Sequence, residues 1–342
     1  MNLPRNTSDD EGSVELLGIV YKKNIGLYSV HSGDRVIPCA LSTRLRKEFI
    51  YTTVDPSSQH RRVMAVKEID HSDPIAIGDQ VRLTEAGDGT GLIQGILPRR
   101  NRLSRRTAVA MPGAHAFEQV VAANIDQVVP VFAISQPEPH WAMLDRYLAS
   151  AESFDLPALI CITKLDLIEA DADGSLVGEI QTIAHGYRQI GYPVISISVR
   201  TGEGLDELRE ALHDKVSVFV GKSGVGKTSL LNALQPGLGL HTQAVNRATG
   251  KGRHATTWLE MFPLDLGGAI LDTPGMREVG LWDVNRDELA FLFPEMRPLM
   301  GKCRFGVDCQ HDEEPGCAIR QAVVEGEISP RRYQSYLRLR EG

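Results

Sequence analysis

Residues 221–228 read Gly-Lys-Ser-Gly-Val-Gly-Lys-Thr, a complete G-x-x-x-x-G-K-[ST] phosphate-binding loop. The apolar run 216–220 before the loop predicts a strand, and residues 229–234 after it predict a helix. Glycines let the loop turn its backbone N–H groups toward a phosphate, and the helix N-terminus adds partial positive charge. This context separates the motif from a glycine turn that merely precedes a helix, and it predicts binding of a nucleoside triphosphate.

Two side chains of this loop are expected to act on the phosphates. Lys227 would reach the β- and γ-phosphates and is a candidate catalytic residue, whereas the Thr228 hydroxyl would bind Mg²⁺. The candidate nucleotide-binding residues of the segment are Gly221, Lys222, Ser223, Gly224, Val225, Gly226, Lys227, Thr228 and Ser229.

A second motif upstream indicates which base is read. Residues 163–166 read Thr-Lys-Leu-Asp after the apolar run 158–162 and resemble the N-K-x-D signature of GTPases, whose Asp accepts from the N1–H and 2-amino groups of guanine. A threonine stands where that signature has Asn, and a hydroxyl makes fewer hydrogen bonds than an amide. Alone, the motif is equally a surface Lys–Asp pair, but beside a phosphate loop it predicts guanine. The Ser-Ile-Ser segment 196–198 resembles the backbone clamp over that base. The candidate base-site residues are Thr163, Lys164, Leu165, Asp166 and Ser196.

A third loop is a candidate for Mg²⁺ and the γ-phosphate. Residues 272–275 read Asp-Thr-Pro-Gly after the apolar run 268–271 and resemble the D-x-x-G element of GTPases. There Asp272 would hold Mg²⁺ through water, and the Gly275 N–H would sense the γ-phosphate. Met276 follows where many GTPases carry the glutamine that orients the attacking water.

The group that positions the water must therefore come from elsewhere or from a partner. His254 is the candidate catalytic residue, since it lies between the phosphate loop and Asp272 and next to Thr256 and Thr257. One of these two threonines, with Thr256 as the candidate, would bind Mg²⁺ in the closed state. The alternative is a surface histidine in a glycine-rich loop.

The order of the motifs is unusual. Both base-site segments, at 163–166 and 196–198, precede the phosphate loop at 221–228, whereas in ordinary GTPases they follow it. Loops at the carboxyl ends of neighbouring parallel strands converge wherever the chain is cut. The sequence therefore predicts a circularly permuted α/β GTPase domain whose original ends are joined through residues 205–217.

This order, with its flanks, resembles the RsgA/YjeQ family of circularly permuted GTPases that assist maturation of the bacterial small ribosomal subunit. The resemblance covers nearly the whole chain after residue 13 and includes Gly-Arg-His-Ala-Thr-Thr at 252–257, where Ala255 replaces a Thr of the family pattern. It implies GTP hydrolysis with Mg²⁺, binding of the small subunit and its rRNA, a role in late maturation, and docking and release controlled by GTP and GDP. It also points to His254.

A cysteine cluster near the C-terminus predicts a metal site. Three of the five cysteines fall within fifteen residues of one another together with a histidine, and this set suits one closed tetrahedral structural Zn²⁺ per chain. The family pattern often has four residues between the first two ligands, whereas five stand here. A disulfide is the alternative, but we expect a reducing cytosol. Cys39 and Cys161 lie in apolar runs and are expected to be buried core thiols. The candidate zinc ligands are Cys303, Cys309, His311 and Cys317.

The domain organisation is predicted from local patterns. Residues 1–13 are expected to be a disordered tail, and 14–105 carry about five short strands that suggest a small all-β barrel. The family implies an OB-fold there, whereas strand counting alone leaves an SH3-like barrel open. The circularly permuted GTPase domain is expected over 106–285 and a helical zinc-binding domain over 286–342.

Two basic stretches have alternative interpretations. Residues 98–106 hold five arginines and no acid, and they are either a solvated linker or a strip that contacts phosphate. Residues 329–340 predict a helix whose arginines and tyrosines either contact RNA or form a solvated face above a buried Tyr–Leu seam.

Composition bounds the remaining possibilities. The net charge of −7 argues against a surface that binds nucleic acid throughout, and no apolar run is long enough to span a membrane. We expect a cytoplasmic monomer without membrane contact.

Two functions from different classes fit the sequence. One is a slow GTPase whose nucleotide state controls its docking on the small subunit. The other is an rRNA-binding assembly module that uses GTP mainly as a structural ligand, and Met276 favours this second function. A third function, that of an ATP-using kinase, is opposed by the base-site segments. Because the Asp272 strand leads into the C-terminal segment, nucleotide state is expected to reorient residues 286–342 relative to the barrel.

Overall fold

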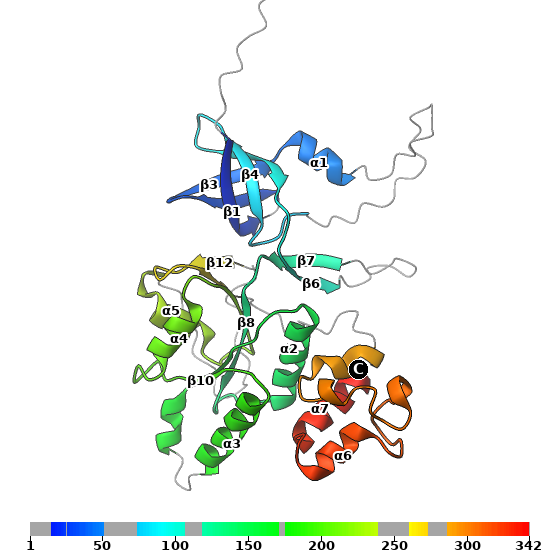
Figure 1. The fold of residues 1–342 in the computed structure, drawn as a ribbon. Coiled ribbons are helices and arrows are strands. Elements are labelled where there is room, and N and C mark those ends of the chain that lie inside the picture. The colour runs from blue at the N-terminus through cyan, green and yellow to red at the C-terminus, as the bar shows by residue number, and fades with distance from the viewer. Residues whose placement is uncertain are drawn as a thin grey trace, which may run out of the picture. The chain divides into compact units, whose positions relative to one another are not determined.

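The chain divides into two compact units. One comprises Met1–Arg102 and Gln119–Asn124, and the other comprises Leu103–Glu118 and Ile125–Gly342. Figure 1 shows the ribbon. This computed structural model describes residues 15–24, 26–50, 74–106, 118–170, 175–238, 260–272 and 286–341.

The N-terminal unit is a closed five-stranded barrel. Its strands pair in the order β1-β2-β3-β5-β4, and β4 pairs with β1 to close the sheet. Alternate residues point inward because successive side chains of a strand face opposite sides. The elements are β1 (Glu15–Asn24), β2 (Leu27–Ser32), β3 (Arg35–Leu41), α1 (Thr43–Ile50), β4 (Gln80–Glu85), β5 (Gly91–Ile96) and β7 (Glu118–Ala123). The core includes Val20, Tyr28, Val30, Ile37, Cys39, Val81, Leu83 and Ile93.

The arginine-rich junction is partly built into this unit. Arg99 makes a bidentate ion pair with the buried Asp79, with Nε–Oδ1 and Nη2–Oδ2 distances of 2.7 and 2.8 Å. The Arg100 N–H donates to Oδ1 of Asn124 at 2.9 Å. Residues Arg102–Arg106 then form strand β6. Arg99 is therefore a structural residue, and neither of the two interpretations of this stretch, linker or phosphate strip, anticipated that.

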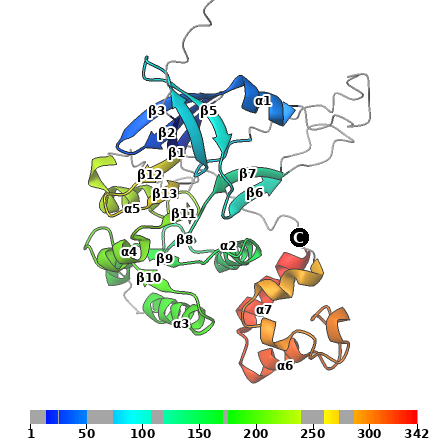
Figure 2. The same cartoon turned by 45° about the horizontal axis from the view of Figure 1, so that its top comes forward.

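A six-stranded α/β sheet forms the centre of the second unit. Its strands lie in the order β10-β9-β8-β11-β13-β12, all parallel except the edge strand β12, and Figure 2 shows this succession. The strands are β8 (Gln127–Ala133), β9 (Ile160–Thr163), β10 (Val194–Ser196), β11 (Val216–Val220), β12 (Glu260–Pro263) and β13 (Ala269–Asp272). The helices are α2 (Trp141–Ser153), η1 (Leu165–Ala170), α3 (Ser175–Gln189), α4 (Leu205–Leu212), α5 (Lys227–Leu234) and η2 (Pro236–Leu238).

Helices cover both faces of this sheet. On one face α4 and α5 bury leucines against Val129, Val131 and Phe219, and on the other α2 and α3 lie over the sheet (Figure 2). The strands are apolar nearly throughout, as expected for parallel strands buried on both sides. Cys161 is fully buried in this core and Cys39 in that of the barrel, as predicted.

The C-terminal segment is small and mostly helical. It contains η3 (Arg286–Leu292), η4 (Arg297–Leu299), η5 (Gly306–Asp308), α6 (Ala318–Glu325) and α7 (Pro330–Glu341). Tyr333 and Tyr336 of α7 are buried in its core, so the buried-seam interpretation of this helix holds for the tyrosines. The segment packs on α2 through α7 and η3. No helix of the described ranges has the length and apolar composition that a membrane span needs.

Candidate functional site

The phosphate loop has the backbone that its glycines predict. It connects the central strand β11 to α5, and Gly224 and Gly226 have φ angles of 86° and 100°. A Cβ on Gly221 would lie 2.3 Å from the carbonyl oxygen of Val131, so no side chain fits there. The loop is thus held tightly against the end of β8, with its backbone free to face a ligand.

Lys227 begins α5 and reaches back over the loop. Its Nζ donates to the carbonyl oxygens of Gly221 at 2.6 Å and Lys222 at 3.1 Å. Burial lowers the pKa of Lys227, and the charge of Asp272 opposes that shift. The ammonium group is therefore already placed at the mouth of the loop, where triphosphate oxygens could replace the two carbonyls.

Thr163 connects the base loop to the phosphate loop. Its hydroxyl is buried, hydrogen-bonds the Val225 carbonyl, and lies 3.2 Å from the carbonyl oxygen of Phe132. The residue that departs from the N-K-x-D signature thus still joins the two loops.

Asp166 is held by a hydroxyl that the sequence pattern did not single out. Oγ of Ser198 donates to Oδ1 of Asp166 at 2.7 Å, and Ser198 is fully buried. The backbone of Ser196 instead lies close to the turn at Gly204, where an added Cβ would be 2.2 Å from the Ser196 carbonyl oxygen. The Ser-Ile-Ser pattern could have pointed to either serine, and only the fold shows which hydroxyl faces the carboxylate.

Lys164 lies beside the same carboxylate. Its ammonium group donates to the carbonyl of Gln136, in the loop between β8 and α2. Burial lowers the pKa of Lys164, and the negative charge of Asp166 opposes that shift. The stem of Lys164 therefore spans the ends of two neighbouring strands, as a side chain that packs along a base would need.

The Mg²⁺ ligands proposed from the sequence are partly described. Asp272 ends β13 and is paired in register with Phe219 of β11, two residues before the phosphate loop begins. Thr228 is the second residue of α5. A carboxylate and a hydroxyl at one edge of the sheet suit a hard cation that prefers oxygen ligands, so these residues fit Mg²⁺. Thr256, His254 and Gly275 lie outside the described residues, as does Met276.

The four predicted zinc ligands come together in the C-terminal segment. They are all buried, and their ligand atoms lie within 4.8 Å of one another. Sγ of Cys303 is 3.9 Å from that of Cys317, and Nδ1 of His311 is 3.4 and 3.6 Å from these two sulfurs. A tetrahedral zinc with Zn–S bonds of about 2.3 Å sets its ligand atoms roughly 3.5–3.8 Å apart. The donor set and its spacing therefore fit Zn²⁺.

Surrounding groups orient the cluster. Backbone N–H groups of Ala318 and Arg320 point at the sulfurs of Cys303 and Cys317, at 3.3 and 3.5 Å. Glu314, which the sequence pattern did not indicate, accepts from the N–H groups on both sides of the histidine, at 2.8 and 2.9 Å. Such outer contacts fix the ligands of a metal site in place.

A buried ion network joins the C-terminal segment to α2. Arg332 of α7 is 4 % exposed; it binds Asp145 at 2.7 Å and makes two contacts with Glu295 at 2.7 and 3.1 Å. Tyr187 donates to the same Asp145 oxygen at 2.6 Å. Burial and the neighbouring Asp145 raise the pKa of Tyr187. One guanidinium therefore bridges two carboxylates from different parts of this unit.

Replacing that guanidinium should be costly. We expect Arg332→Met to destabilise the chain by about 3–5 kcal/mol, because the buried Asp145 and Glu295 would lose the cation that pairs with them. Urea denaturation of the full chain measures the loss. Arg338→Met, an exposed arginine of the same helix, is the control and should change stability little. Equal stability of the two variants would contradict a stabilising network.

Changing Asp166 should alter base selection. We expect Asp166→Asn to weaken GTP binding by roughly ten- to a hundredfold, since a charged acceptor for two guanine donors is lost. ATP binding should change little, so the ratio of the two affinities is the readout. Asp206→Asn, on the exposed start of α4, is the matched control. Unchanged discrimination between GTP and ATP would remove residues 163–166 from the base site.

Comparison with known proteins covers both the site and the whole chain. The model of the RsgA GTPase family matches residues 96–282. A protein of Gemmatimonas aurantiaca named small ribosomal subunit biogenesis GTPase RsgA is 47% identical over 269 residues, which are 78% of this chain and 84% of the relative. The crystal structure of YjeQ from Thermotoga maritima has a TM-score of 0.72 and 29% identity, covering 96% of this chain and 98% of that one. YloQ, described as a circularly permuted GTPase, has a TM-score of 0.67 and 29% identity, covering 98% and 97% of the two chains.

Proposed function

Because this chain belongs to the RsgA GTPase family, it is a GTP-hydrolysing enzyme of small ribosomal subunit maturation, and we propose that its nucleotide state controls docking on that subunit and release from it. The observation that supports the nucleotide-binding part of this proposal is the buried Thr163 hydroxyl, which joins the base loop to the phosphate loop. It links the two halves of a nucleotide site whose strands occur in permuted order.

The residues of the site divide the work of GTP hydrolysis. Asp166, held by Ser198, would select guanine, and Lys227 would neutralise charge that develops on the leaving phosphates. Thr228 and, through water, Asp272 would hold Mg²⁺, which supplies Lewis-acid stabilisation of the phosphate oxygens. His254 is our candidate for positioning the attacking water, since Met276 cannot do so.

The remaining proposals concern the RNA partner, the cellular compartment, the oligomeric state, the barrel and the zinc site. We propose that the small-subunit partner is reached through its rRNA and that the chain works in the cytoplasm, where ribosomes are assembled. All of the nucleotide motifs occur within one sequence, and we infer that the protein acts as a monomer. We assign the closed barrel to the OB-fold, and Cys303, Cys309, His311 and Cys317 to one structural Zn²⁺.

Turnover measurements test the proposal. GTP hydrolysis should rise strongly when purified small subunits are added, since the partner would complete the site. Co-sedimentation with small subunits in GTP, GDP and a non-hydrolysable analogue should show different bound fractions. If turnover is unaffected by the subunit and binding is equal in all three nucleotides, GTP is a structural ligand and the control of docking is excluded.

A further inference from the structure

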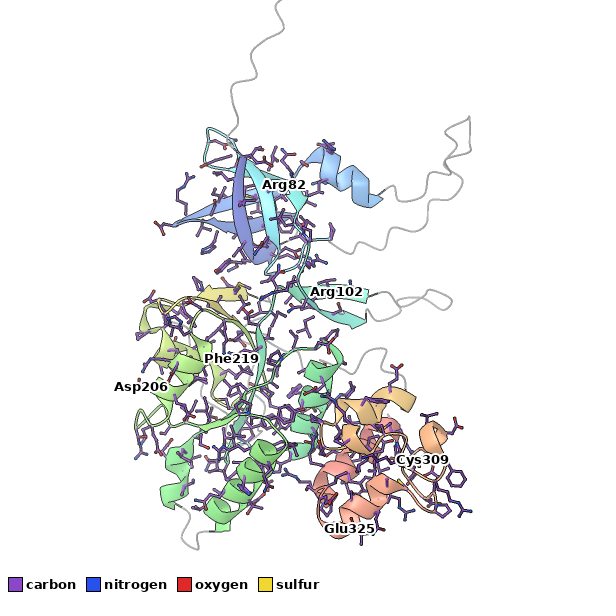
Figure 3. All side chains as sticks on the ribbon, viewed as in Figure 1. Arg82, Arg102, Asp206, Phe219, Cys309 and Glu325 are labelled. Carbon is purple, nitrogen blue, oxygen red and sulfur yellow. The ribbon has the colours of Figure 1, made fainter. Side chains whose placement is uncertain are left out.

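The loop between the first two zinc ligands has a fixed shape. Cys303 and Cys309 anchor its ends, and both are buried. Inside the loop the Gly306 N–H donates to the Cys303 carbonyl at 2.8 Å, and the Arg304 N–H donates to that of Gly316 at 3.0 Å. Figure 3 labels Cys309 on this loop. With zinc bound, the side chains of the loop would be presented from a rigid backbone.

Two of those side chains are apolar and face solvent. Phe305 is 48% exposed and Val307 is 81% exposed. The other core-forming residues of the segment are packed around the cysteines and the tyrosines of α7. Folding of the segment thus gives no reason for an aromatic residue at this position, whereas exposed aromatic side chains on rigid loops are suited to contacts with a partner.

Two cations stand beside the exposed phenylalanine. Lys302 and Arg304 are both exposed, and within the described residues no ion pair joins either of them to a carboxylate. Of the acids close in sequence, Glu314 is engaged by backbone N–H groups and Asp312 by Arg340. The exposed Asp308 is the one acid of the loop itself, and the exposed Glu313 lies outside the loop, after His311. The face of the loop at residues 302–307 is therefore basic and aromatic.

We propose that residues 302–307 form an RNA-docking loop, in which Phe305 stacks on an unpaired base of the small subunit's RNA while Lys302 and Arg304 contact its phosphates. Val307 adds apolar contact beside the stacked base. Unpaired RNA bases stack on aromatic side chains, and phosphates are bound by lysine and arginine. The two cations, without carboxylate partners in the described part of the chain, favour the polyanionic RNA over a protein as the occupant. This inference rests on the proposed function and names the part of the chain that reaches the RNA.

Matched variants test the contact in the full-length, zinc-loaded protein. Phe305→Ala and Val307→Ser are compared with Phe291→Ala and Val324→Ser, whose native side chains are equally exposed, at 48% and 81%. We expect Phe305→Ala to weaken binding to purified small subunits by about tenfold or more, whereas both control variants bind like the unchanged protein. Zinc content and basal GTP turnover should be the same in all four variants.

Salt dependence tests the role of the cations. Lys302→Ala and Arg304→Ala should each reduce the slope of log K against log salt concentration by about 0.7–0.9, because each removes one phosphate contact. Phe305→Ala should weaken binding without changing that slope. If Lys302→Ala and Arg304→Ala both show the slope of the unchanged protein, the proposed phosphate contacts are wrong.

Crosslinking identifies the partner. A photoreactive benzophenone analogue in place of Phe305 should crosslink to RNA in the small-subunit complex. Crosslinking to a ribosomal protein instead, or small-subunit binding unaltered by Phe305→Ala, would overturn the inference while leaving the proposed function intact. Failure of the unchanged protein to bind small subunits at all would overturn both.

Discussion

Replacing Lys227 by alanine is expected to reduce GTP turnover by roughly a hundred- to a thousandfold, the loss typical of removing one preorganised charge-stabilising group. The ammonium group lies 2.6 Å from the Gly221 carbonyl oxygen at the mouth of the phosphate loop. It would stabilise the negative charge that builds up on the oxygen between the β- and γ-phosphates as the bond to the γ-phosphate breaks. No other described residue places a cation from α5 over this loop.

The measurement is single-turnover GTP hydrolysis together with nucleotide affinity. Triphosphate binding should weaken and the rate of the bound complex should fall, whereas melting temperature should stay close to that of the unchanged protein. Lys222→Ala removes a side chain of the same loop but keeps the backbone N–H that would face the phosphate, so it is the matched control and should retain turnover. Hydrolysis by Lys227→Ala at the unchanged rate would refute the assignment of this loop.

Contiguous motifs account for what the sequence predicted well. The phosphate loop of this chain holds three glycines, a lysine and a threonine within eight residues, so its chemistry and its position between a strand and a helix can both be recognised from a short stretch of sequence. The predicted bounds of β11 match the structure, because the segment is strongly apolar. The permuted order of the motifs can likewise be recognised from the sequence, since only the positions of the motifs along the chain are needed to see it.

Long-range polar contacts account for what it missed. Arg332 and Asp145 are 187 residues apart in the sequence, and neither stands in a recognisable motif. The pairs Arg99 with Asp79 and Ser198 with Asp166 were also not predicted, although Asp166 and Ser198 each lie in a segment that the sequence singled out. A single sequence does not show which charged side chains form ion pairs, because the pairing depends on how the fold places the helices and strands that carry them. The edge strand β12 was missed for a related reason: it is short and stabilised by its pairing with β13.

The position of Arg332 bears on how nucleotide state could reach the C-terminal segment. That segment is attached to α2 by a buried ion network as well as by the chain that follows Asp272. The loop leading into α2 contributes the Gln136 carbonyl that Lys164 contacts. A nucleotide-driven movement of residues 286–342 alone would have to break this network. A movement of these residues together with α2 would keep it.

Replacing Cys309 by serine is expected to remove the metal and unfold the C-terminal segment. Structural zinc commonly contributes about 10 kcal/mol or more to folding of its own domain, and this segment is too small to compensate from its apolar core. Burial raises the pKa of the Cys309 thiol to about 12, so without a cation the pocket keeps it protonated. A bound divalent metal would therefore supply the charge that the buried sulfurs need.

Elemental analysis and limited proteolysis measure the outcome together. The unchanged protein should hold one equivalent of zinc, and the Cys309→Ser variant should hold none. Its residues 286–341 should become protease-sensitive, while the barrel and the six-stranded sheet stay resistant because they have cores of their own. Cys39→Ser, which alters a buried thiol of the barrel, is the matched control and should keep its zinc. Metal-free protein with a protease-resistant C-terminal segment would exclude this site, since the four ligands would then be held together by packing alone.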